Sequence, residues 1–123
     1  MIHTAQPERL VAAMEQFDLD GAVACFSPQA RLYFCGMLVA TGRPVIRRLL
    51  LPWFADLEDF RHRTIALWSA GGVSVVEADV RYRSAGRCPV SIPVTSVLRW
   101  NSGQIEECRV NTWRELFPRI HAA

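Results

Sequence analysis

Apolar residues in the first part of the chain recur at helical spacing. Pro7 suits the first turn of a helix, because its ring already holds the backbone angle that a helix needs. The apolar stripe that follows is made of Leu10, Val11, Met14 and Phe17. Asp18 can then cap a second short helix, which Ser27-Pro28 ends. These residues predict a hairpin of two helices.

Aromatic and branched side chains predict strands in the rest of the chain, interrupted by one more helix. A first strand is expected over residues 30–35 and a loop over residues 36–42. Pro44 opens a third helix, which Pro52 should kink or divide because its ring clashes with the preceding turn. Four longer strands are expected over residues 59–69, 73–84, 89–100 and 104–114.

Helices followed by a meander of strands predict an α+β fold, in which three N-terminal helices pack on one face of an antiparallel sheet. Pro93 lies inside a strand that should be well paired, so we expect a bulge or an edge there, and bulges help a sheet to curve. A strongly curved sheet would enclose a cavity between its concave face and the helices. No repeat, low-complexity tract or Pro/Gly-rich linker divides the sequence, so we expect a single domain over residues 1–123.

The charge pattern narrows the range of partners. The net charge is only +2, and the arginines are scattered among acidic residues, so a nucleic-acid partner is not expected. All 14 basic residues are arginine, which removes Schiff-base and lysine-nucleophile chemistry. The first residues lack a basic segment followed by an apolar run, and the longest apolar stretches are too short for a membrane span. We therefore expect a cytoplasmic protein without a membrane partner.

The four cysteines show no paired spacing. They are Cys25, Cys35, Cys88 and Cys108. Only three histidines accompany them, so neither a zinc site nor a disulfide framework is indicated, and no metal or other cofactor is expected. Buried free thiols are the simplest interpretation.

Four short segments, together with the order of the expected elements, resemble one known superfamily. They are residues 18–26, 30–34, 42–46 and 103–105. They are similar to the SnoaL-like superfamily, which includes ketosteroid isomerases, polyketide cyclases, limonene epoxide hydrolases and nuclear transport factor 2. These are packing and turn signals, so they speak for fold more than for activity. The resemblance implies a cone-shaped, cystatin-like domain with a pocket for a small apolar molecule, and a homodimer joined through the outer face of the sheet.

The catalytic residues of the ketosteroid isomerases do not carry over. That enzyme needs a carboxylate base and an oxyanion hole made from a tyrosine and a protonated aspartate. In this chain the tyrosine position falls at Leu10, the base at Phe34 and the oxyanion aspartate at Ser96. Leu and Phe cannot move protons, and a serine hydroxyl donates a weaker hydrogen bond than such an acid. Steroid isomerisation by that mechanism is disfavoured.

The pattern of the epoxide hydrolases carries over at one position of five. Asp79 matches an aspartate of that site, whereas the arginine, tyrosine, asparagine and second aspartate are replaced. The replacing residues are Glu77, Leu32, Phe34 and Trp113. Epoxide opening needs both a base that activates water and an acid that protonates the departing oxygen, so Asp79 alone would supply half of it.

Asp79 is the first catalytic candidate, and two arguments disagree about its direction. The register of the family points it into the pocket, where burial would raise its pKa and make it a usable base. In contrast, Glu77, Asp79 and Arg81 alternate with apolar residues, which is typical of a strand with one solvated face. The residues leave both directions open.

His62 is the second catalytic candidate. It alternates with Arg61 and Arg63, so if the arginines face water the imidazole faces the cavity and can act as a base near neutral pH. A hydrogen-bonded structural histidine is the alternative. If His62 and Asp79 both point inward, they form an acid/base pair on neighbouring strands.

The expected pocket wall is mostly apolar. Its residues are Leu10, Met14, Leu32, Phe34, Trp53, Trp68, Ser96 and Trp113. Tyr33, Arg109, Asn111 and Thr112 could add hydrogen bonds, although sheet pairing and surface solvation explain them equally well. Core or subunit-interface packing is the alternative for the tryptophans.

Two functions are compatible with these residues. The first is a small-molecule enzyme, an isomerase, cyclase or hydrolase that acts by proton transfer on a polyketide-, terpenoid- or steroid-like substrate. The second is a non-catalytic dimeric module of the same fold that binds a ligand or a protein. Two convergent titratable groups in a cavity would favour the enzyme, and a filled core with an exposed apolar patch would favour the module.

Overall fold

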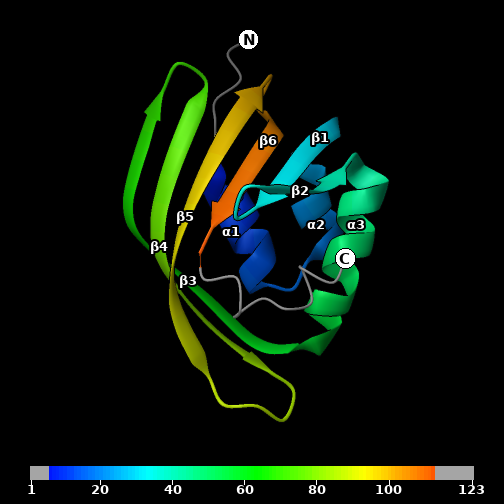
Figure 1. Cartoon of the computed structure of the whole chain (residues 1–123), viewed down its shortest axis with the longest axis vertical. Helices are drawn as coiled ribbons and strands as arrows, with labels where there is room; N and C mark the ends of the chain where they lie inside the picture. Colours follow the sequence, from blue (N-terminus) through cyan, green and yellow to red (C-terminus); the bar gives the residue numbers. More distant parts are fainter. Residues whose placement is uncertain (1–5, 113–123) are drawn as a thin grey trace.

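The computed structural model describes residues 6–112 of the chain, which form three helices and one sheet. In chain order the elements are α1 (Pro7–Glu15), α2 (Leu19–Ala24), β1 (Phe26–Phe34), β2 (Met37–Thr41), α3 (Arg43–Asp56), β3 (Leu57–Ala70), β4 (Val73–Ser84), β5 (Val90–Asn101) and β6 (Gln104–Asn111). Long, bent strands pass around one side of the three helices, as Figure 1 shows. The α+β class predicted from the sequence is confirmed.

The six strands form one sheet in the order β2-β1-β6-β5-β4-β3. Four of the five strand pairs are antiparallel, and the pair β1–β6 is parallel. The sheet is antiparallel as expected except in this one pair. Tight turns force strands that are neighbours in sequence to run in opposite directions, but β1 and β6 are far apart in sequence and are free of that constraint.

The residues between β1 and the third helix form a strand rather than the expected loop. Phe34 pairs with Met37, and Cys35 and Gly36 make a two-residue turn in which both φ angles are positive, 50° and 83°. Such a turn matches the twist of the two strands that it joins. β1 also begins at Phe26, earlier than expected, because α2 ends at Ala24.

The two internal prolines each test an expectation. Pro52 lies inside α3, which runs on through it and is not divided. Pro93 pairs with Asp79 of β4 without a register shift, so the expected bulge is absent there, whereas the pairing of β5 with β6 begins only at Thr95, so Pro93 lies at an unpaired edge on that side. The carbonyl of Pro93 accepts a hydrogen bond of 2.6 Å from Thr112 Oγ1 on the β6 side, so the missing N–H of Pro93 also belongs to that side. No bond to β4 is lost.

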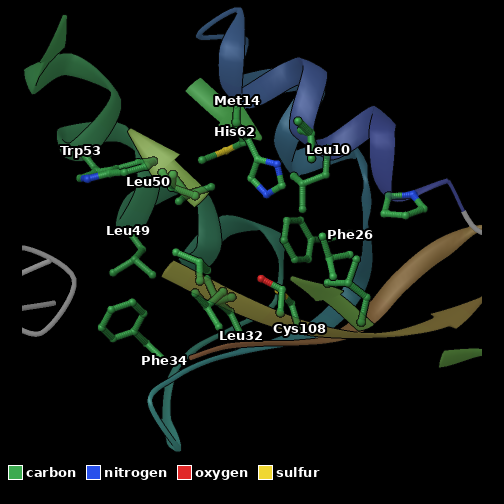
Figure 2. Close-up of a pocket in the computed structure, with 18 of the residues that line it drawn as sticks. Leu10, Met14, Phe26, Leu32, Phe34, Leu49, Leu50, Trp53, His62 and Cys108 are labelled. Atoms are coloured by element: carbon green, nitrogen blue, oxygen red, sulfur yellow. The ribbon is translucent and has the colours of Figure 1, made fainter. Parts of the chain in front are cut away.

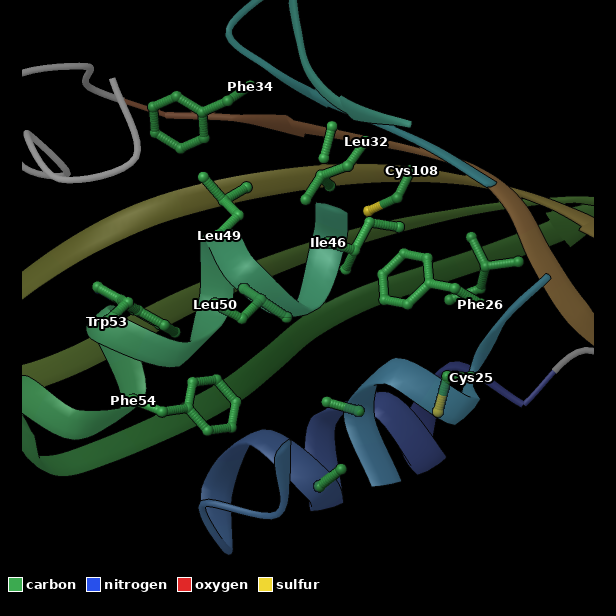
Figure 3. Close-up of a cluster of buried hydrophobic side chains, with 14 of the residues drawn as sticks. Cys25, Phe26, Leu32, Phe34, Ile46, Leu49, Leu50, Trp53, Phe54 and Cys108 are labelled. Carbon is green, nitrogen blue, oxygen red and sulfur yellow. The ribbon is translucent and has the colours of Figure 1, made fainter. Parts of the chain in front are cut away.

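The core lies between α3 and one face of the sheet (Figure 3). Ile46, on the first turns of α3, is fully buried, and Trp53 near its end packs edge-to-face on Phe60 of β3 with ring centroids 5.6 Å apart. Such a pair adds about 0.5–1.5 kcal/mol to the burial of the rings. It anchors the end of α3 to the sheet.

Candidate functional site

A cavity of about 160 Å³ lies between the helices and the sheet (Figure 2). Helices α1 and α3 supply one part of its wall, and all six strands supply the rest. The wall consists of Pro7, Leu10, Val11, Met14, Phe26, Leu32, Phe34, Val39, Leu49, Leu50, Trp53, Phe60, His62, Val76, Val80, Val94, Ser96, Leu98, Cys108 and Val110.

The alternation of side chains along the strands decides which residues reach the cavity. Successive residues of a strand point to opposite faces of the sheet. In β4 the even-numbered Val76 and Val80 are buried and line the cavity, whereas Glu77 and Arg81 are exposed. On α1 the helical spacing brings Leu10 and its neighbours onto the same wall.

Within residues 6–112, His62 is the only side chain on the cavity wall that can act as a base near neutral pH. In Figure 2 its imidazole lies between Met14 and Leu10 and points toward the other wall residues. Burial lowers the pKa of His62 below its ordinary value of 6.5, and the carboxylate of Glu15 opposes this shift in part. His62 is therefore mostly neutral at pH 7 and is able to accept a proton.

His62 is held by two polar contacts. Its backbone N–H donates to Glu15 Oε2 over 3.1 Å, which ties β3 to the end of α1. Its Nδ1 lies 3.5 Å from Thr64 Oγ1, at the long limit of a hydrogen bond. If Nδ1 is engaged by Thr64, Nε2 remains for a molecule in the cavity.

Ser96 and Cys108 are the other two polar groups on the wall. Val80 pairs with His62 on one side and with Ile92 on the other, so Ser96 lies four residues further along β5. At about 3.3 Å per residue, this offset is about 13 Å along the strand. The buried thiol of Cys108 has its pKa raised to about 12, mainly by burial, so it stays protonated at neutral pH. Ser96 therefore lies too far along the sheet to act on the same atom as His62, and the protonated thiol of Cys108 does not act as a base at neutral pH.

Asp79 lies on the outer face of the sheet, away from the cavity. It pairs with Arg63 of β3 both in the strand register and through an ion pair of their side chains. The alternation of charged and apolar residues in β4 therefore predicts its direction correctly, and the family register does not. His62 faces the cavity from the neighbouring strand, opposite Val80. The acid/base pair of His62 and Asp79 is not formed.

Most of the other residues predicted for the pocket lie on its wall. These are Leu10, Met14, Leu32, Phe34, Trp53 and Ser96. Trp68 does not: it pairs with the outward Val75, and 56% of its surface is exposed. Trp113 lies outside the described residues.

The polar candidates of β1 and β6 serve the sheet and its outer surface. The guanidinium of Arg109 stacks 3.9 Å above the centre of the Tyr33 ring, and Arg109 Nε also donates to Glu107 over 3.0 Å. Asn111 is exposed, and Thr112 binds the Pro93 carbonyl. Hydrogen bonds from these residues into the cavity are therefore not formed.

Sequence reasoning missed several wall residues. Phe26 was assigned to the second helix, but it opens β1 and projects into the cavity. Phe60 lies two residues before His62, so the alternation that places His62 inward also places Phe60 there. Of the four thiols, the expected burial holds for Cys25 and Cys108, whereas Cys35 is half-buried and Cys88 is exposed.

The described residues contain no group of three or more His, Cys, Asp or Glu side chains arranged to hold a metal ion. Within residues 6–112, none of the helices has the length and apolar character needed to cross a membrane. The wall of the cavity offers an apolar surface with one mostly neutral histidine.

Comparisons with known proteins agree with this architecture. A nuclear transport factor 2-like protein of unknown function from Burkholderia pseudomallei superposes with a TM-score of 0.78 at 15% identity, covering 93% of each chain. A proposed SnoaL-like polyketide cyclase from Shewanella denitrificans gives a TM-score of 0.79 at 11% identity, covering 95% of each chain. An LEH-like epoxide hydrolase from M. tuberculosis gives 0.77 at 17% identity, covering 94% of this chain and 86% of its own.

At these identities the likeness shows the shared fold and not a shared activity. A search of curated protein sequences found no significant match. The family model described as the SnoaL-like domain matches residues 8–108, which is most of the chain. The chain therefore belongs to the SnoaL-like domain family.

Proposed function

We propose that the protein binds a small apolar molecule in the cavity and that His62 transfers a proton to or from it. The observation that carries this proposal is the position of His62, a neutral imidazole on a wall that is otherwise almost entirely apolar. A pocket of this composition favours apolar ligands, and a base with a pKa near or below neutral pH is matched to proton transfer. Isomerase, cyclase and hydrolase reactions all contain such a step.

A proton-transfer assay can test this proposal before the natural substrate is known. Small apolar ketones such as cyclohexanone exchange the hydrogen atoms next to the carbonyl group when a base removes and returns a proton. In D₂O, the protein should accelerate the incorporation of deuterium, measured by mass spectrometry. Because general-base catalysis contributes about 10²–10⁴-fold, His62→Asn should remove most of the acceleration.

Thr64→Val serves as a matched control, because it changes the neighbour of His62 and leaves the base itself in place. We expect it to alter the exchange rate by much less than His62→Asn. Equal exchange rates in the wild type and in His62→Asn, for ketones whose binding has been measured, would contradict a proton-transfer role. The non-catalytic module would then be the better description.

The second candidate function, a dimeric binding module, is favoured by the outer face of the sheet. One register row crosses five strands there and is largely apolar. From β3 to β1 it contains Trp68, Val75, Val97, Arg109 and Tyr33. A row that contains Arg99, Glu107 and Arg31 borders it on one side, and Glu77 borders it on the other. A face that carries both signs around an apolar strip is able to match a second copy of itself.

Substitution of the exposed tryptophan tests the homodimer. We expect Trp68→Glu to shift the protein to the monomer, because it places a charge in the apolar row. Leu51→Glu is the control: Leu51 is comparably exposed, at 52%, but lies on α3. Sedimentation equilibrium measures the oligomeric state of both variants, and we expect only Trp68→Glu to be monomeric. A wild type that is monomeric at all concentrations would rule out the homodimer.

A further inference from the structure

The volume of the cavity limits the ligand that the proposed function requires. The cavity has a volume of about 160 Å³ and is partly open to solvent. An apolar cavity of about 150 Å³ in another protein binds benzene, whereas pockets for drug-sized molecules occupy about 300–1,000 Å³. The cavity of this protein is thus of the size that one ring fills, and a fused-ring steroid is too large to lie within it.

The charges around the cavity limit the ligand further. Except for His62, Ser96 and Cys108, the described wall residues are apolar. The buried thiol of Cys108 is protonated, and His62 is mostly neutral at pH 7, so the wall offers no stable counter-ion. Burial of an ionised group without a partner is strongly unfavourable, so a carboxylate or ammonium on the ligand is selected against.

His62 selects the polar group that the ligand carries. A neutral imidazole has one donor and one acceptor nitrogen, and the long contact with Thr64 occupies at most one of them. A hydroxyl group both donates and accepts, so it can pair with either tautomer of His62. We infer that the cavity is built for an uncharged, single-ring molecule with one hydroxyl group, which His62 binds. This inference rests on the proposed function, because it names the ligand class of the same cavity.

Calorimetric titrations with four probes test the inference, at a pH of about 8 where His62 is neutral. The probes are benzene, phenol, 1-naphthol and estradiol. In estradiol, a phenol ring is one of four fused rings. We expect phenol and benzene to bind, 1-naphthol to bind more weakly than phenol, and estradiol not to bind. In His62→Leu, phenol should bind roughly three- to tenfold more weakly, the value of one hydrogen bond, while benzene binds as before.

Val80→Phe supplies a variant that fills the cavity beside His62, because Val80 lines the cavity and pairs with His62 in the strand register. The larger side chain occupies ligand space, so phenol binding should be lost while the protein stays folded. Retained phenol binding in Val80→Phe would place the ligand elsewhere and overturn the inference. Thermal unfolding of each variant shows that its binding data come from folded protein.

The possible failures are distinct. If estradiol binds as tightly as phenol, the size limit is wrong and the proposed binding function stands. If phenol affinity is the same in His62→Leu, the assignment of the hydroxyl group to His62 is wrong. If none of the four probes binds the wild type, the proposed apolar ligand site itself is contradicted.

Discussion

Three arginines on the outer face of the sheet converge on one carboxylate. Glu107 is paired with Arg31 and Arg109 at 3.0 Å and with Arg99 at 3.3 Å, and the guanidinium groups cover it so that only 6% of the residue is exposed. The hydrogen bonds from Arg109 and Arg31 lower the pKa of Glu107 below its ordinary value of 4.5. The cluster links β1, β5 and β6 through side chains.

Removal of this charge should destabilise the fold. Glu107→Gln keeps the shape but weakens three charge-assisted contacts, so we expect the free energy of unfolding to fall by about 1–3 kcal/mol at neutral pH. Because the pKa is lowered in the folded state, this contribution is present above about pH 4.5 and is lost as the pH falls through the folded pKa. Urea unfolding measures it, with the exposed Glu106→Gln as control. Equal losses in both variants would contradict a special role for Glu107.

The thiols should differ strongly in reactivity. The thiolate is the reactive form, and Cys108 is buried with a pKa of about 12, whereas Cys88 is exposed. With iodoacetamide at a pH of about 8, we expect Cys88 to be alkylated first and Cys108 to react only in denaturant. Peptide mass spectrometry identifies the modified residue. Similar rates for the two thiols in the native protein would show that the cavity wall opens readily.

At the scale of elements, three pairs of consecutive strands are joined by two-residue turns in which both φ angles are positive. The turn between β3 and β4 is Gly71-Gly72, which lies between the strands expected over residues 59–69 and 73–84. Gly71 has φ of +58°, and a Cβ atom added there would meet nothing within 4 Å. The backbone conformation at Gly71, and not the space around it, therefore limits which residues this position accepts.

A pair of substitutions separates these two effects. Asparagine tolerates the left-handed region, so Gly71→Asn should leave the stability nearly unchanged. Gly71→Val places a branched side chain in the same conformation and should cost about 1–2 kcal/mol. Thermal or urea unfolding of the two variants gives the difference. A Gly71→Val protein as stable as Gly71→Asn would mean that the turn has changed its conformation.

Alternation along the strands predicts the directions of side chains well until a bulge intervenes. His62 and Phe60 follow it and face the cavity. Between Thr64 and Ala66 the register of β3 shifts by one residue, so Leu67 pairs with the inward Val76, and Trp68 turns outward. A bulge is set by pairing with the neighbouring strand and leaves little trace in the sequence of β3. The position of Trp68 was therefore beyond sequence reasoning.

Other features escaped prediction for reasons of length and distance. β2 has five residues, so its apolar pattern is too short to be told from a loop. The parallel pair of β1 and β6 depends on contacts between segments that are far apart in sequence, which periodicity does not report. The helices and long strands, whose patterns span many residues, were located correctly apart from their ends.

At the scale of the whole molecule, His62 couples stability to pH. Burial lowers its pKa in the folded state, so the unfolded chain binds a proton more readily between the folded pKa and about 6.5. We therefore expect the wild type to lose stability as the pH falls below about 6.5. In His62→Leu this part of the pH dependence should be absent, as urea unfolding at a series of pH values would reveal. The same slope in both proteins would show that other groups cause it.

The place of β6 in the sheet has a consequence for how the chain is made. β6 follows the other five strands in sequence, yet it lies between β1 and β5 and holds the two halves of the sheet together. Until β6 has been synthesised, β1 and β2 can pair with each other but cannot join β3, β4 and β5. We therefore expect no stable half-domain to form during translation, so the apolar side chains of the early strands stay open to aggregation until β6 emerges.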